Sequence, residues 1–89
     1  MKIKLELFGA SRDFSNKEFL EFNIKQKMEI KDFRKEVINY LDKNFRGSEN
    51  FIKIVKKSVF CSEDNNIVSD DFKIIKDQKI GIIPPIGGG

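Results

Sequence analysis

The sequence predicts an α+β fold in which a mixed sheet packs on one main helix. Three observations predict it: two early segments alternate apolar and polar residues, the next segment repeats its apolar residues at helical spacing, and β-rich segments follow. A length of 89 residues suits a single domain. Hydrophobic residues make up 39% and charged residues 35% of the chain, a balance that favours a folded globular protein over a disordered one.

The first two strands are predicted at residues 2–8 and 18–24, because both segments alternate with a period of two. Their apolar faces comprise Ile3, Leu5 and Leu7 in the first segment and Leu20, Phe22 and Ile24 in the second. Residues 9–16 between them include Gly, Ser, Asp and Asn and are predicted to form a loop. The three segments together predict an antiparallel hairpin with a long connection.

The main helix is predicted over residues 30–46, where the period of the apolar residues changes to that of a helix. Its apolar stripe consists of Ile30, Phe33, Val37, Tyr40, Leu41 and Phe45. Gly47 stands where a glycine commonly ends a helix. The start of the helix is less sharply marked, because Glu29 is not a favoured N-cap.

The second half of the chain is predicted to be mostly strand. Residues 51–61 are rich in β-branched and aromatic residues, with an interruption at 56–58. Residues 63–66 form a polar turn cluster, and residues 67–75 are compatible with a short strand and a tight turn. A last strand is expected at residues 79–83.

Two strands, one helix and further strands follow one another in the order of the β-grasp fold, in which the last strand runs parallel beside the first. We therefore predict a β-grasp domain over residues 1–83. Residues 84–89 are predicted to form a flexible C-terminal tail, because prolines and glycines make up most of this segment.

Several catalytic and binding chemistries are excluded by composition. The sequence has no histidine and one cysteine, so Ser-His and Cys-His catalytic pairs, imidazole metal sites and cysteine-pair zinc sites are not expected. It also has no glycine-rich phosphate loop of the P-loop type. We expect no metal site, no bound cofactor and no self-sufficient active site.

The charge pattern also limits the expected partners and the location. The net charge is +3, but lysines alternate with Asp and Glu along the chain, which favours a mixed solvated surface over a nucleic-acid interface. A single cysteine indicates a reducing compartment, and no segment resembles a signal peptide or a transmembrane helix. The sequence therefore predicts a cytoplasmic protein without nucleic-acid or membrane partners.

The most informative segment is the ending, which reads Pro84, Pro85, Ile86, Gly87, Gly88 and Gly89. Prolines donate no amide hydrogen, so they end a strand and favour an extended exit from the domain. Glycines have no side chain and can enter a channel too narrow for a Cβ atom. A terminal carboxylate delivered in this way could be activated by ATP as an acyl adenylate. Attack by a sulfur nucleophile would then leave a thiocarboxylate.

This P-P-x-x-G-G ending resembles that of a family, the sulfur-carrier small subunits of molybdopterin synthase, which are ubiquitin-like. The residues that match the motif are Pro84, Pro85, Gly88 and Gly89. The opening is similar too, because residues 8–13 follow the family's aromatic–small–x–x–Arg–acidic segment. Residues 74–80 resemble the family's turn before the last strand, although Gln78 and Lys79 depart from the usual residues.

The resemblance implies a reaction cycle centred on Gly89. An E1-like adenylating enzyme would use ATP to activate the Gly89 carboxylate, and sulfur would be added to form the thiocarboxylate. Residues 84–88 would then insert with Gly89 into the active site of the large synthase subunit. Sulfur would pass to a pyranopterin precursor of the molybdenum cofactor. The implied assembly is a heterotetramer in which this chain is a non-catalytic sulfur donor.

Three apolar residues are candidates for contact with these partners. Phe8 and Phe19 fall on the predicted outer face of the hairpin, and Ile83 could extend the same patch. Arg12 matches a position of the family and is interpreted as a loop ion pair. Cys61 is interpreted as a small apolar filler, since no base or second thiol accompanies it.

Other functions start from the same ending. A thiamine-pathway sulfur carrier shares the fold and a glycine ending, but its usual chain is shorter and lacks the double proline. A ubiquitin-like modifier, which forms isopeptide bonds with lysines, also begins with a terminal glycine adenylate. A binding module with an idle, frayed tail is the plainest alternative. The final strand that leads directly into the tail favours a working tail over an idle one.

Overall fold

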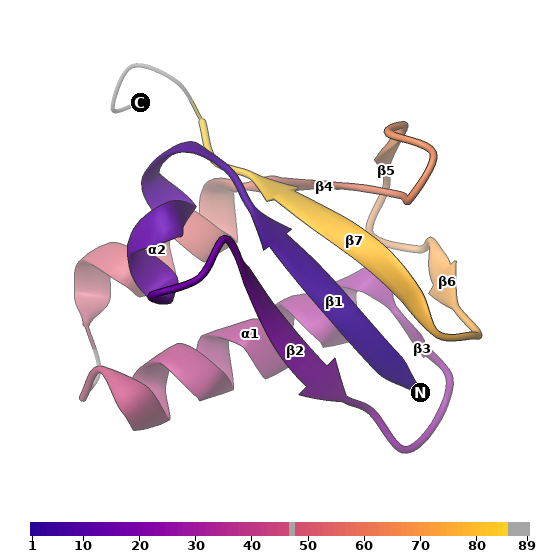
Figure 1. The fold of residues 1–89 in the computed structure, drawn as a ribbon, viewed down its shortest axis with the longest axis horizontal. Helices are drawn as coiled ribbons and strands as arrows, with labels where there is room; N and C mark the ends of the chain where they lie inside the picture. Colours follow the sequence, from indigo (N-terminus) through magenta and orange to yellow (C-terminus); the bar gives the residue numbers. More distant parts are fainter. Residues whose placement is uncertain (47, 86–89) are drawn as a thin grey trace.

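The computed structural model describes residues 1–46 and 48–85, and five strands within them form one mixed sheet in the order β2-β1-β7-β4-β5 (Figure 1). These strands are β1 (Lys2–Leu7), β2 (Phe19–Asn23), β4 (Val59–Cys61), β5 (Ile67–Val68) and β7 (Gln78–Ile83). The first and last strands lie side by side and run parallel, as the β-grasp prediction requires. β2 pairs antiparallel with β1, which confirms the predicted hairpin.

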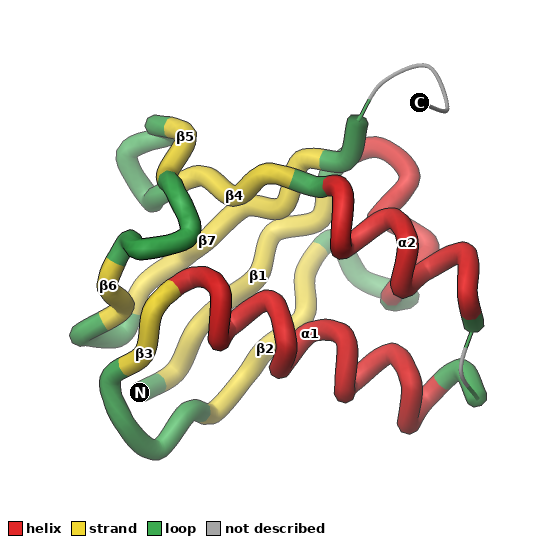
Figure 2. Tube along the Cα trace, turned by 180° about the vertical axis from the view of Figure 1, so that it is seen from behind, coloured by secondary structure: helices red, strands yellow, loops and turns green. Residues whose placement is uncertain are grey.

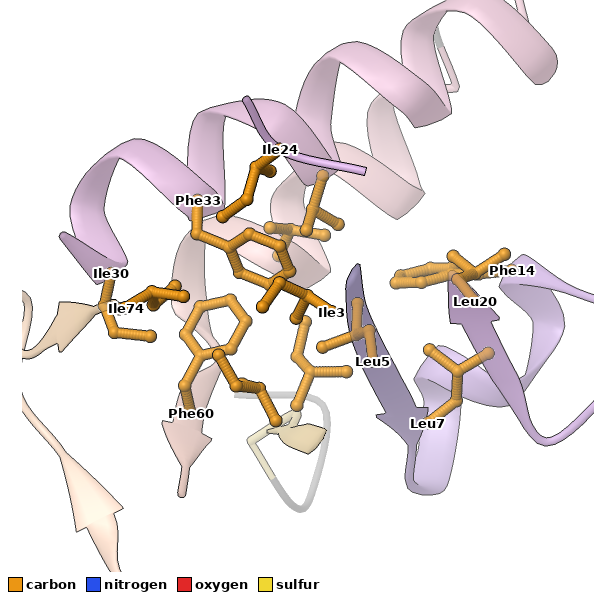
Figure 3. Packing of buried hydrophobic residues seen from close by; sticks show 14 of the residues in the cluster. Ile3, Leu5, Leu7, Phe14, Leu20, Ile24, Ile30, Phe33, Phe60 and Ile74 are labelled. Carbon is orange, nitrogen blue, oxygen red and sulfur yellow. The ribbon is translucent and has the colours of Figure 1, made fainter. Parts of the chain in front are cut away.

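The centre of the sheet, β1 and β7, supplies much of the core (Figure 3). Leu5 lies opposite Ile80 and Leu7 opposite Ile82 in the parallel pair, and all four side chains are buried. Along the other edge of β1, Leu20 of β2 lies opposite Leu5 and is also buried. The period-two pattern therefore identified the buried face of these strands correctly.

The main helix α1 (Ile30–Asn44) covers one face of the sheet (Figure 2). Phe33, Val37 and Leu41 are fully buried along its stripe, as their spacing predicts. Asp32 helps to fix the start of α1, because its carboxylate accepts the Glu29 amide at 3.3 Å. The helix is two residues shorter than the predicted range of 30–46, and Gly47 lies outside the described residues.

A second helix, α2 (Glu49–Lys57), replaces most of the strand predicted at 51–61. Its helical signals are an N-cap at Ser48, whose hydroxyl accepts the Phe51 amide at 3.5 Å, and basic residues in its last turn. Phe51, Ile54 and Val55 share the face turned toward the core, at spacings of three and four. The prediction was wrong because β-branched composition outweighed this spacing, and strand β4 begins only at Val59.

A short 3-10 helix, η1 (Gly9–Phe14), occupies most of the loop predicted at residues 9–16. Ser11 closes its first turn, because the buried hydroxyl accepts the Phe8 amide at 2.9 Å and donates to the Phe8 carbonyl at 2.6 Å. Phe14 is buried at its end and packs on Phe51 of α2, with ring centroids 5.0 Å apart. The loop prediction missed this segment because a single buried serine holds the turn.

The connections after β4 carry the remaining short elements. Residues 63–66 turn as predicted, since the Ser62 amide donates to the Asn66 carbonyl at 2.8 Å. The ambiguous segment 67–75 contains β5 and then β6 (Lys73–Ile74), which pairs with β3 (Met28–Glu29) in a small second sheet beside the start of α1 (Figure 1).

Arg34 joins three of these regions. Its guanidinium donates to the carbonyls of Val55 and Ser58, each at 2.7 Å, and to the Asp70 carboxylate at 3.1 Å. The same group lies 4.9 Å from the centroid of the Phe60 ring. Because the side chain is largely buried and makes these three hydrogen bonds, it joins the end of α2 to α1 and to the segment before β6.

Candidate functional site

The candidate site is the point where the chain leaves the sheet at the end of β7. Gly81 and Ile82 are flanked on both sides, by β1 and by β4. Ile83 still pairs with Val59 of β4. The last strand is therefore held in the middle of the sheet almost to the tail, so the exit has a fixed position and direction.

Pro84 belongs to this fixed base, because it is buried, whereas Pro85 is exposed. Pro84 lies beside Gly9, where a Cβ atom on Gly9 would come within 3.9 Å of its ring. Gly9 adopts a φ of +55°, which favours glycine, and the Ser11 hydroxyl holds the preceding residue in place. The η1 turn thus supports the start of the tail.

The remaining tail residues predicted to enter a partner, Ile86, Gly87, Gly88 and Gly89, lie outside the described residues. Their insertion and the role of Gly89 stay predictions from the sequence. The predicted boundary between the domain and the tail, after residue 83, also stays a prediction.

Phe8 lies across the outer face of β7 next to the exit. A Cβ atom on Gly81 would lie 3.0 Å from Phe8 Cε2 and 2.6 Å from Cys61 Sγ. The missing side chain of Gly81 therefore leaves the space in which the Phe8 ring and the Cys61 thiol pack. Cys61 is buried and forms no disulfide, in agreement with its interpretation as an apolar filler.

An apolar surface surrounds this point on the outer face of the sheet. Directly opposite residues of antiparallel strands share a face, so Val59 and Ile83 lie on the same side, as do Cys61, Gly81 and Ile67. Phe8, Val59 and Ile67 are exposed, with Ile67 at 70%. We call the residues Phe8, Val59, Ile67 and Ile83 the exit patch.

Phe19 does not join the exit patch. It lies on β2 opposite Glu6 of β1, so that Glu6 stands between Phe19 and Gly81 in the same row of the sheet. Glu6 is paired with Lys79 at 3.4 Å. The Phe19 ring is instead covered by the ammonium groups of Lys4, 4.2 Å from its centroid, and of Lys17.

Sequence reasoning found Phe8 and Ile83 of the exit patch but missed Val59 and Ile67. These residues join the surface through the pairing of β4 with β7 and β5, which no local pattern reveals. Arg12, predicted to make a loop ion pair, is exposed and forms none with residues 1–46 or 48–85.

The groups whose pKa is shifted, Asp71 and Lys31, lie near β3 and β6, at the end of β7 opposite the exit. The Ser69 hydroxyl, by its hydrogen bond to Asp71, lowers the pKa of that exposed carboxyl. The hydrogen bond and charge of Glu29 raise the pKa of the exposed Lys31.

Metal-binding clusters and membrane-spanning helices are both absent from the described part of the chain. Among residues 1–46 and 48–85, no three of the Cys, Asp and Glu side chains gather in a way that could hold a metal ion. No helix within these two ranges is long and apolar enough to cross a membrane.

Comparison with solved structures identifies the fold. A protein from Pyrococcus furiosus described as a "putative molybdopterin converting factor, subunit 1" superimposes with a TM-score of 0.64 at 18% identity, over 96% of this chain and 98% of that chain. SAMP1 from Haloferax volcanii superimposes with a TM-score of 0.68 at 10% identity, over 100% of both chains. No protein-family model and no curated protein matches the sequence. The likeness confirms the predicted α+β, β-grasp fold, and the first of these structures agrees with the resemblance read from the sequence.

Proposed function

We propose that this chain is a ubiquitin-like sulfur carrier that works as the small subunit of a molybdopterin synthase. The observation that carries the proposal is the exit: a strand held between β1 and β4 leads directly into Pro84, Pro85 and a Gly-Gly-Gly ending. Gly89 is the acceptor of sulfur in this proposal. The similarity of the fold to a molybdopterin converting factor subunit supports the pathway.

The chemistry proceeds in two steps on partner enzymes. A carboxylate oxygen of Gly89 attacks the α-phosphorus of ATP on an E1-like adenylating enzyme, and pyrophosphate leaves. A sulfur nucleophile at the oxidation level of sulfide then attacks the acyl carbon, and AMP leaves with the former carboxylate oxygen. The product is a thiocarboxylate, which the large synthase subunit uses to transfer sulfur to a pyranopterin precursor.

The domain contributes position rather than catalytic groups. The buried Pro84 and the paired end of β7 fix where the tail begins, so a partner that docks beside the exit receives the tail in one direction. Glycines reduce the width of the tail but lose much conformational freedom on binding. The partner must offset this loss, and the exit patch offers apolar surface for that purpose.

The activation step is tested by ATP–pyrophosphate exchange with a cognate adenylating enzyme. We expect exchange with the unaltered chain. We expect none with a chain that lacks Gly88 and Gly89 or that carries one additional residue after Gly89. Undiminished exchange with either altered chain would refute the role of the Gly89 carboxylate.

The docking role of the exit patch is tested by Ile67→Asp, with Ile75→Asp as its matched control. Both isoleucines are exposed, at 70% and 57%, so neither aspartate should disturb the core. A charge at position 67 would be desolvated in the complex, and we expect the Kd for the large subunit to rise roughly tenfold or more. Ile75 lies beyond β6, away from the exit, and its variant should bind normally. Equal affinities would remove the exit patch from the interface.

A ubiquitin-like protein modifier is a rival of a different class, because the same fold and the same terminal adenylate serve both functions. The two functions differ in what attacks the activated carbonyl, a sulfur nucleophile or a lysine amine. Lysine-linked conjugates of this chain in cells would favour the modifier. Their absence, together with pyrophosphate exchange, would favour the carrier.

A further inference from the structure

The outer edge of the sheet is formed by β2, which pairs with β1 on one side and with no described strand on the other. At one end of the pair, the Leu7 amide donates to the Glu18 carbonyl at 2.9 Å. At the other end, the Ile24 amide donates to the Met1 carbonyl at 2.9 Å. Hydrogen-bonded and non-bonded positions alternate in an antiparallel pair, so the amides and carbonyls of Phe19, Glu21 and Asn23 point away from β1.

A groove lies along this open edge, lined by residues of β2 and of the C-terminal half of α1. It consists of two adjoining hollows of about 430 and 510 Å³ that share Tyr40 and Asn44. Leu20 and the exposed Phe45 contribute to the first hollow, and Phe22 contributes to the second. The edge therefore combines unpaired backbone groups with apolar and aromatic surface where alternate side chains of an added strand could lie.

The charges around the groove favour a basic occupant. Glu21, Glu36 and Asp42 line it, against Lys17 and Lys43, although the whole chain carries a net charge of +3. The second hollow holds two of the three acidic residues and lies against the last turns of α1. The C-terminal end of a helix carries partial negative charge, which also attracts cations.

A second copy of this chain fits the edge less well. The antiparallel register that pairs all three outward-pointing residues is centred on Glu21, so it would place two Glu21 side chains opposite each other. Like charges directly opposite each other in a sheet are destabilising. The same register would place Lys17 opposite Lys25 at the ends of the paired region.

We propose that the β2 edge is a docking site for an extended peptide segment of a partner protein, one with alternating apolar residues and flanking lysine or arginine. The segment would add a strand to the sheet and place its apolar side chains over Tyr40 and Phe45. This site does not involve the tail, so it is independent of the sulfur chemistry proposed above. Removal of Gly88 and Gly89 should leave it intact.

The test uses a synthetic peptide, Lys-Lys-Val-Thr-Ile-Thr-Val-Lys-Lys, and amide hydrogen exchange followed by NMR. Strand addition predicts slower exchange for the amides of Phe19, Glu21 and Asn23. The amides of Leu20 and Phe22 already bond to β1 and serve as internal controls with little change. No protection at saturating peptide, or equal binding of a peptide with glutamates in place of the lysines, would overturn the proposal.

Paired charge reversals test the acidic character of the groove. The double variant Glu36→Lys/Asp42→Lys should weaken peptide binding by roughly fivefold or more, since two exposed attractions become repulsions. The control Glu63→Lys/Asp64→Lys makes the same charge change in an exposed turn and should bind as the unaltered chain does. If peptide binding weakened equally in both double variants, the attraction would be a nonspecific effect of net charge, and the acidic groove would have no role. Protection of the three edge amides that rises with protein concentration in the absence of peptide would assign the edge to a second copy.

Discussion

The two strands on which the two proposals rest, β7 and β2, differ in how they are paired in the sheet. Gly81 and Ile82 of β7 are flanked by strands on both sides, whereas β2 is paired on one side only. β7 leads to the tail, and β2 leads through a turn and the short strand β3 to the main helix. The proposed chemistry is thus attached to a strand that is paired on both sides, and the proposed peptide site to a strand that is paired on one side.

The difference follows from what each task requires. A tail that must reach into another protein needs a fixed starting point, because freedom at its base would add to the entropy lost on insertion. A strand that accepts a partner must keep its outward amides and carbonyls unpaired. The following predictions test whether the two strands differ as described.

The largest difference should appear in native-state amide exchange. The amides of Gly81 and Ile82 should exchange only through opening of nearly the whole domain, while those of Phe19, Glu21 and Asn23 should exchange through small local motions. We expect the two groups to differ by roughly 5 kcal/mol in opening free energy. Similar values for both groups would show that β7 is not the restrained strand.

Truncation of a buried side chain on β7 should lower the free energy of unfolding by almost as much as this difference. Ile82→Ala removes methyl groups from a fully buried position and should lower the free energy of unfolding by about 2–5 kcal/mol. Ile67→Ala on β5, where the side chain is 70% exposed, should lower it by less than about 0.5 kcal/mol. Urea denaturation measures both values. Comparable losses would contradict the difference in burial between the two positions.

A smaller loss of the free energy of unfolding is expected for a substitution at Gly81, where the Phe8 ring lies across β7. Gly81→Ala places a Cβ atom against Cys61 Sγ and the Phe8 ring, and should lower the free energy of unfolding by about 1–3 kcal/mol. Cys61→Ala removes the closer of the two contacts, so the double variant should recover part of that loss. A double-variant cycle with strictly additive losses would show that the thiol is not the obstacle.

The order of elements at the start and end of the chain could be read from the sequence because it rests on local patterns. In β1, β2 and β7 the alternating apolar residues lie on the buried face of the strand, and in α1 the apolar residues at helical spacing lie on the buried face of the helix. The segment that became α2 could not be read from composition, since Phe51, Ile52, Ile54 and Val55 suit a strand as well. Ser48 and the spacing of the apolar residues decide for a helix.

The candidate site divides in the same way. The tail is a local motif, so the roles of Pro84 and Gly89 could be proposed from the sequence alone. The exit patch depends on strands far apart in sequence, and only the register of β4 against β7 brings Val59 beside Ile83. Phe19 was grouped with Phe8 because both fall on the outer face of one hairpin, but Glu6 and two lysines separate it from the exit.

The central claim is that Gly89 carries sulfur, and intact mass spectrometry tests it most directly. The chain is incubated with ATP, a cognate adenylating enzyme and a sulfur source, and a chain lacking Gly88 and Gly89 is treated in parallel. We predict a gain of about 16 Da, from one oxygen replaced by sulfur, in the complete chain alone. No gain, with an adenylating enzyme shown to be active on another carrier, would contradict the account.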